Sequence, residues 1–106
     1  MRKILSLIIA VATIASVAKA QNIKIEPHFW WSGMQESELQ LMVYGENISS
    51  YKAEVESSNV RIIESVTLDS PNYQIIYLDV SNSVPEKFDI TFTNGKKKLK
   101  HSYELK

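Results

Sequence analysis

The chain has 106 residues, with 12 basic and 12 acidic side chains and no cysteine. This length allows one domain and excludes a (β/α)8 barrel, which needs about 200 residues or more. The charge gives no reason to expect nucleic-acid binding, which depends on a basic surface, and we interpret the one basic cluster, Lys96, Lys97, Lys98 and Lys100, as a solvated strand. Without cysteine the fold has no disulfides to stabilise it.

Residues 1–20 have the pattern of a secretory signal peptide. Arg2 and Lys3 give a positive start, residues 4–17 are almost wholly apolar, and residues 18–20 (Ala-Lys-Ala) fit a cleavage site. The apolar run is shorter than the roughly 20 residues that a membrane span requires. We therefore expect cleavage after Ala20, with no membrane anchor remaining.

The exported domain would span residues 21–106, which are 86 residues with 9 Lys and Arg against 12 Asp and Glu. Its net charge would be −3, so the neutral balance of the precursor conceals a mildly acidic domain. We expect this domain in the periplasm, with the extracellular space as the alternative.

From residue 22 onward, apolar and polar residues alternate with the two-residue period of β-strands, and no stretch keeps a helical period. Clusters of Gly, Pro, Asn and Ser separate the following runs: 22–26, 38–45, 51–55, 60–68, 73–80, 87–93 and 96–105. The pattern predicts an all-β chain that folds as an antiparallel β-sandwich of about seven strands. An immunoglobulin-like arrangement is the first choice and a small open barrel is the alternative.

The alternation also predicts which side of each strand faces the core. Three runs place every second residue inward, from Leu39 to Val43, from Ile76 to Val80 and from Phe88 to Phe92. In the run 60–68 the apolar face would comprise Val60, Ile62, Val66 and Leu68. Glu64 interrupts that face, which indicates a bulge or a switch between sheets. Asn94-Gly95 predicts a tight hairpin before the last strand.

Candidates for catalysis and metal binding are few. His28 and His101 are far apart in the sequence and no Cys accompanies them, whereas a zinc site needs about four convergent ligands. We expect no metal and no cofactor, and we interpret His101 as a hydrogen-bonded, half-buried structural residue. Glu54 and Glu56 share a strand face, but glycosidase carboxylates flank a sugar in a cleft, so we interpret both as exposed strand residues. We predict no catalytic residue in this chain.

The stretch EPHFWWSGMQ, residues 26–35, places Phe29, Trp30 and Trp31 side by side before a Ser-Gly turn. Neighbouring strand residues point to opposite faces, so both tryptophans cannot enter one core. Flat aromatic rings contact the apolar faces of sugars and are frequent in protein interfaces. We expect one tryptophan on a contact surface; the alternative is that one fills the end of the core while the other shields a loop.

Residues 25–48, IEPHFWWSGMQESELQLMVYGENI, resemble the opening of the amino-terminal domain of cyclomaltodextrinases and neopullulanases. That domain begins with a V-E-P-x-F-W-W-x-G-M phrase and continues into an L-Q-L-M-V-Y-G strand. The matching positions here are Glu26, Pro27, Phe29, Trp30, Trp31, Gly33, Met34 and residues 39–45. The resemblance covers essentially the whole chain after residue 20.

The resemblance implies an immunoglobulin-like sandwich that precedes an α-amylase-type catalytic barrel in a glycoside hydrolase. In that family the barrel holds the catalytic carboxylates, while the sandwich packs on the barrel or on a partner subunit and in relatives binds α-glucan. The substrates are maltodextrins, cyclodextrins or pullulan. The 106 residues contain no barrel, so no catalytic residue is carried over and we expect the chain alone to be inactive. It would be a truncated product, a fragment of a longer gene or a stand-alone module.

The first hypothesis is therefore a non-catalytic accessory domain of an exported α-glucan hydrolase. The residues expected to contact the barrel or a maltodextrin are Phe29, Trp30, Trp31, Met34 and Tyr44. One alternative is a stand-alone carbohydrate-binding module whose aromatic surface includes Tyr44, Tyr73 or Tyr77. Another is an exported sandwich that binds a protein partner.

Overall fold

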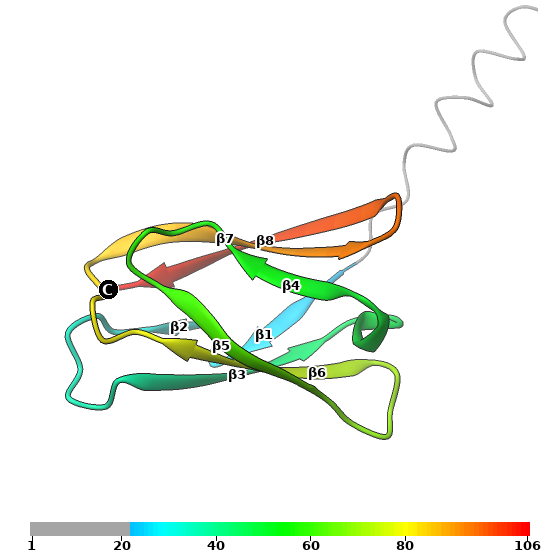
Figure 1. Ribbon diagram of the computed structural model, residues 1–106, viewed down its shortest axis with the longest axis horizontal. Coiled ribbons are helices and arrows are strands. Elements are labelled where there is room, and N and C mark those ends of the chain that lie inside the picture. The colour runs from blue at the N-terminus through cyan, green and yellow to red at the C-terminus, as the bar shows by residue number, and fades with distance from the viewer. Residues whose placement is uncertain (1–21) are drawn as a thin grey trace, which may run out of the picture.

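The computed structural model describes residues 22–106 (Figure 1), so the predicted signal peptide lies outside the described residues. The described residues form eight strands and one short 3-10 turn: β1 (Lys24–Glu26), β2 (Phe29–Trp30), β3 (Glu38–Tyr44), η1 (Ile48–Ser50), β4 (Lys52–Val55), β5 (Arg61–Thr67), β6 (Tyr73–Asp79), β7 (Glu86–Asn94) and β8 (Lys97–Leu105). Among these residues no helix is long and apolar enough to cross a membrane.

The strands form two four-stranded sheets, with the orders β1-β3-β6-β5 and β2-β8-β7-β4 (Figure 1). These orders correspond to the ABED and CFG sheets of the immunoglobulin fold, with β2 added at the edge of the second sheet. The prediction of an all-β, immunoglobulin-like sandwich is confirmed. One feature was not anticipated: the chain crosses from the first sheet to the second between β1 and β2, and β2 then pairs parallel with β8.

The core lies between the two sheets and is built from the alternating residues that the sequence predicted. In β3, residues 39, 41 and 43 are buried while their neighbours are exposed. The same alternation buries Ile76 and Leu78 in β6 and Phe88, Ile90 and Phe92 in β7. Each such side chain contributes about 1.5–3 kcal/mol when it leaves water. This hydrophobic burial stabilises a fold that has no disulfides.

Strand β5 carries the predicted irregularity, but its consequence differs from the expectation. Its register against β6 shifts between Ile62 and Glu64, which is the bulge that Glu64 indicated. One extra residue exchanges the two faces of a strand from that point onward. Val66 therefore pairs with Ile75 on the outer face, and Leu68 is exposed. The prediction that both face the core with Ile62 is wrong for this reason.

The predicted hairpin joins β7 to β8. Asn94 pairs with Lys97, which leaves Gly95 and Lys96 as a two-residue loop. Gly95 has a φ of 58°, a left-handed conformation that glycine adopts without steric cost. A glycine at the first loop position is what a type II′ hairpin requires, so the turn chemistry agrees with the strand pairing.

Candidate functional site

Three adjacent aromatic residues, Phe29, Trp30 and Trp31, form a tryptophan cluster where the chain enters the second sheet. Phe29 and Trp30 constitute β2 and pair with Glu104 and Leu105 of β8. Trp30 is half-buried and packs against the core, whereas Trp31 is 46% exposed. The second tryptophan is therefore a surface residue, as the alternation of side chains predicted for one of the two.

The ring of Trp31 rests on its two aromatic neighbours. Its centroid lies 5.2 Å from that of Phe29 and 5.3 Å from that of Trp30, with interplanar angles of 58° and 59°. Tilted contacts at this separation are favourable by about 0.5–1.5 kcal/mol each beyond the area that they bury. Trp31 is thus exposed and yet supported by two rings, which lowers the entropy that it would lose in a complex.

The carboxyl-terminal residue, Lys106, is held against this cluster. Its backbone N–H donates to the carbonyl of Trp30 at 2.8 Å, and its carbonyl accepts from the Ser32 N–H at 2.7 Å and the Ser32 hydroxyl at 2.9 Å. Its ammonium lies 4.1 Å from the centroid of the Phe29 ring, a cation–π contact. These bonds extend the β2–β8 pairing, so the carboxyl end lies beside the cluster (Figure 1).

The five residues predicted to form the site do not lie together. Met34 follows the tryptophan cluster in the loop between β2 and β3 and is 44% exposed. Tyr44 belongs to a different surface because it pairs with Lys24, at the end of β1 opposite to the crossing. The short sequence distance between Trp31 and Tyr44 is misleading, since β3 carries the chain along the length of the first sheet.

Tyr44 instead belongs to a second aromatic group on the outer face of the first sheet. Its ring centroid lies 5.1 Å from that of Tyr73, its cross-strand partner in β6. These two rings, with Lys24, Glu26 and Met42, line a cavity of about 320 Å³. We call these five residues the tyrosine pocket. The alternation in β1 predicts that Lys24 and Glu26 point outward. It does not predict that they lie beside β3.

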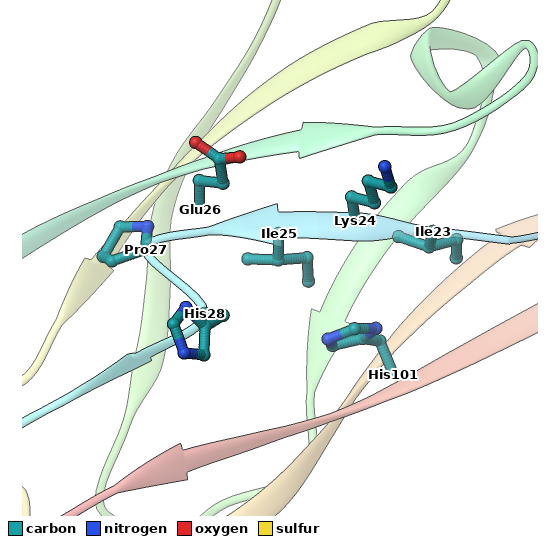
Figure 2. Close-up of a pocket in the computed structure, with 7 residues that line it drawn as sticks. All are labelled: Ile23, Lys24, Ile25, Glu26, Pro27, His28 and His101. Atoms are coloured by element: carbon teal, nitrogen blue, oxygen red, sulfur yellow. The ribbon is translucent and has the colours of Figure 1, made fainter.

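A separate cavity of about 390 Å³ lies at the open edge between β1 and β8. Figure 2 shows His101 reaching toward β1, with His28 on the turn after Pro27 and with Lys24 and Glu26 on the opposite side of β1 from Ile25. The two histidines, although far apart in sequence, line the same cavity. His101 is half-buried, as predicted, and burial lowers its pKa. Within residues 22–106, no group of three or more His, Cys, Asp or Glu side chains is placed to hold a metal ion.

Comparison with known protein families identifies the family of this sandwich. Residues 24–106 match the family model of the cyclomaltodextrinase N-terminal domain. The chain belongs to this family. The match starts at the first residue of β1 and includes every strand of both sheets, so the resemblance found in the sequence is confirmed.

Membership in the cyclomaltodextrinase N-terminal family supports an accessory domain of this enzyme type. Glu54, in the edge strand β4, and Glu56, directly after it, are both exposed, because they alternate with Ala53 and Val55 on the inner side. Both are exposed, as predicted, but only Glu54 lies within the strand. Among the described residues of this cyclomaltodextrinase N-terminal domain, the tryptophan cluster and the tyrosine pocket each present an exposed aromatic ring.

Proposed function

We propose that the protein is a non-catalytic accessory domain of an exported α-glucan hydrolase of the cyclomaltodextrinase and neopullulanase type, and that its tryptophan cluster packs on the catalytic barrel. The observation that carries this proposal is Trp31, which is 46% exposed and supported by two aromatic rings. Tryptophan is among the residues that contribute most to the stability of protein interfaces.

The position of Lys106 supports the same partner. In an enzyme where the catalytic domain follows the family domain, the polypeptide beyond Lys106 starts beside Trp30, to whose carbonyl the Lys106 N–H is bonded. The first segment of the following domain is thereby brought close to the exposed face of Trp31. Met34, also exposed, adds a flexible apolar side chain to the loop that follows the cluster.

The test is a binding measurement between the purified protein and the catalytic barrel of a family enzyme expressed without its own amino-terminal domain. We expect Trp31→Ala to weaken the association at least about tenfold, the loss that accompanies removal of an interface tryptophan. The matched control is Ile63→Ala, because Ile63 is 52% exposed but lies on β5. Equal binding by Trp31→Ala and by the unchanged protein, with both folded by circular dichroism, would contradict the proposal.

A stand-alone carbohydrate-binding module is the second candidate function, and the tyrosine pocket is the observation that favours it. Sugar binding at the pocket and barrel contact at the tryptophan cluster do not exclude each other, because the two features occupy different surfaces. A maltodextrin bound at the pocket leaves Trp31 free to contact a barrel.

We also propose export to the periplasm, on the basis of the signal-peptide pattern in residues 1–20. Expression of the full chain in a bacterial host should yield a periplasmic protein whose intact mass begins at Gln21. A mass that retains residues 1–20 in the membrane fraction would show that the segment acts as an anchor instead.

A further inference from the structure

We infer that the free edge of β8 binds an extended acidic segment of a partner protein, which pairs with it as an additional strand. The free edge is the side of β8, over residues 97–103, that faces away from β7. The inference goes beyond the proposed function and rests on neither the barrel contact nor the tyrosine pocket. It stands on unpaired backbone groups, on a cavity beside them and on the lysines of the same strand.

Most of this side of β8 is unpaired because β2 is short. The sheet order places β8 between β7 and β2, but β2 pairs only with Glu104 and Leu105. Among the described residues, no strand pairs with the free edge between residues 97 and 103. A row of unpaired N–H and C=O groups is a template on which another chain can add a strand.

The register identifies the backbone groups that the free edge presents. The N–H of Lys106 donates to the Trp30 carbonyl and its carbonyl accepts from the Ser32 N–H, so both groups point away from β7. In an antiparallel strand, backbone groups at every second residue point the same way, and β8 pairs with β7 without a register shift. The same two groups are therefore open to a new strand at three positions: Lys98, Lys100 and Ser102.

The cavity of about 390 Å³ between β1 and β8 adds an apolar element to this site. Figure 2 shows Ile25 and His101 on the sides of β1 and β8 that face each other. Inward side chains of an added strand would alternate as those of β8 do, so they would cover the half-buried Leu99 and His101. Apolar residues at these positions would bury the open side of the core.

The lysines determine the charge of the partner. Lys98 and Lys100 are exposed and point outward from β8, and the hairpin adds the exposed Lys96 and Lys97. Side chains directly opposite each other on paired strands lie about 4.5–5.5 Å apart, where opposite charges attract and like charges repel. Pairing of this edge with the same edge of a second copy would bring lysines together. An extended segment with alternating acidic and apolar residues satisfies the backbone, the cavity and the lysines at once.

The probe for this site is the fluorescently labelled peptide Thr-Glu-Val-Glu-Val-Glu-Thr, titrated by anisotropy against the protein purified after expression of the full chain. At about 0.15 M salt, charges more than about 8 Å apart are largely screened. We expect saturable binding that weakens about fivefold in Lys98→Glu, because a cross-strand attraction becomes a repulsion. Lys52→Glu is the matched control and should stay within about twofold. Lys52 lies in the same cross-strand row, through Thr93, but on the opposite edge of the sheet.

Amide hydrogen exchange distinguishes strand pairing from attraction by charge alone. The bound peptide should slow exchange at least about tenfold at alternate residues, while the intervening amides, which already face β7, change little. The residues expected to be protected are Lys98, Lys100 and Ser102. A peptide with methyl groups on its three glutamate nitrogens cannot donate to the carbonyls of this edge and should not bind.

Absence of saturable binding to the folded protein would overturn the inference, as would equal binding of the methylated peptide or equal loss of affinity in Lys98→Glu and Lys52→Glu. Dimerisation that protects the same amides without peptide would assign the edge to a second copy, contrary to the inference. The titration contains neither barrel nor sugar, so its outcome is independent of the proposed function. Trp31→Ala should bind the peptide as the unchanged protein does.

Discussion

Replacement of Tyr103 by alanine should lower the free energy of unfolding by about 3–5 kcal/mol, the range measured for removal of large buried aromatic side chains. Tyr103 is fully buried in β8, and its ring lies 6.0 Å from that of Phe88. Its hydroxyl donates to the carbonyl of Pro27 at 2.8 Å, at the point where the chain crosses between the sheets. Since small domains have a total stability of about 5–15 kcal/mol, this variant should be substantially destabilised in urea titrations followed by circular dichroism.

Tyr103→Phe is the control that separates the ring from the hydroxyl. It keeps the packing against Phe88 and removes only the bond to Pro27, which should cost about 0.5–1.5 kcal/mol. Burial raises the pKa of the Tyr103 hydroxyl, so this group remains a neutral donor across the working range of pH. If the phenylalanine variant were as unstable as the alanine variant, the hydrogen bond rather than the ring would stabilise this end of the sandwich.

The inner and outer faces of the strands were predictable because the two-residue period of a strand is a property of the backbone. Leu39, Leu41 and Val43 lie in the core for this reason, and so do the alternating residues of β6 and β7. The same rule predicts that Trp30 and Trp31 point to opposite faces, one toward the core and one toward the surface. The order of turns and runs was sufficient for an all-β fold of the sandwich or barrel type, because several short strands at regular spacing favour these two architectures.

Pairing between distant strands was not predictable from local pattern. Alternation shows that Tyr44 and Tyr73 both face outward, but only the β3–β6 register places them opposite each other. Tyr44 and Trp31 lie on different surfaces because a seven-residue strand spans about 20 Å, a separation that their short distance in the sequence does not show. The bulge in β5 was also only partly predictable. Glu64 marked its position, but which face of β5 turns toward the core after the bulge depends on the pairing with β6.

The second large expected loss of stability concerns a polar residue on the core side of β6, Gln74. Gln74 is 1% exposed, and its Nε2 donates to the carbonyls of Ile48 and Tyr51, each at 2.9 Å. These carbonyls lie at the two ends of the turn η1, which leads into β4. The side chain of Gln74 therefore joins a central strand of the first sheet to the segment that starts the edge strand of the second.

Gln74→Leu should lower the free energy of unfolding by about 2 kcal/mol. The variant loses two buried hydrogen bonds, each with a net contribution of about 0.5–1.5 kcal/mol, and leaves the Tyr51 carbonyl without this donor. One effect opposes this loss: the Oε1 of Gln74 is buried without a hydrogen-bond partner in the described residues, and leucine removes that unpaired atom. Because the two bonds hold an entire turn, we expect their loss to be the larger effect.

Urea unfolding of Gln74→Leu beside Gln40→Leu provides the measurement. Gln40 points outward from β3 and is exposed, so its replacement should change stability by no more than about 0.5 kcal/mol. Amide hydrogen exchange should also accelerate at Tyr51, whose N–H closes η1 by donating to Ile48. A Gln74→Leu variant as stable as the unchanged protein would show that the cost of the unpaired Oε1 cancels both bonds, and that packing alone positions the turn.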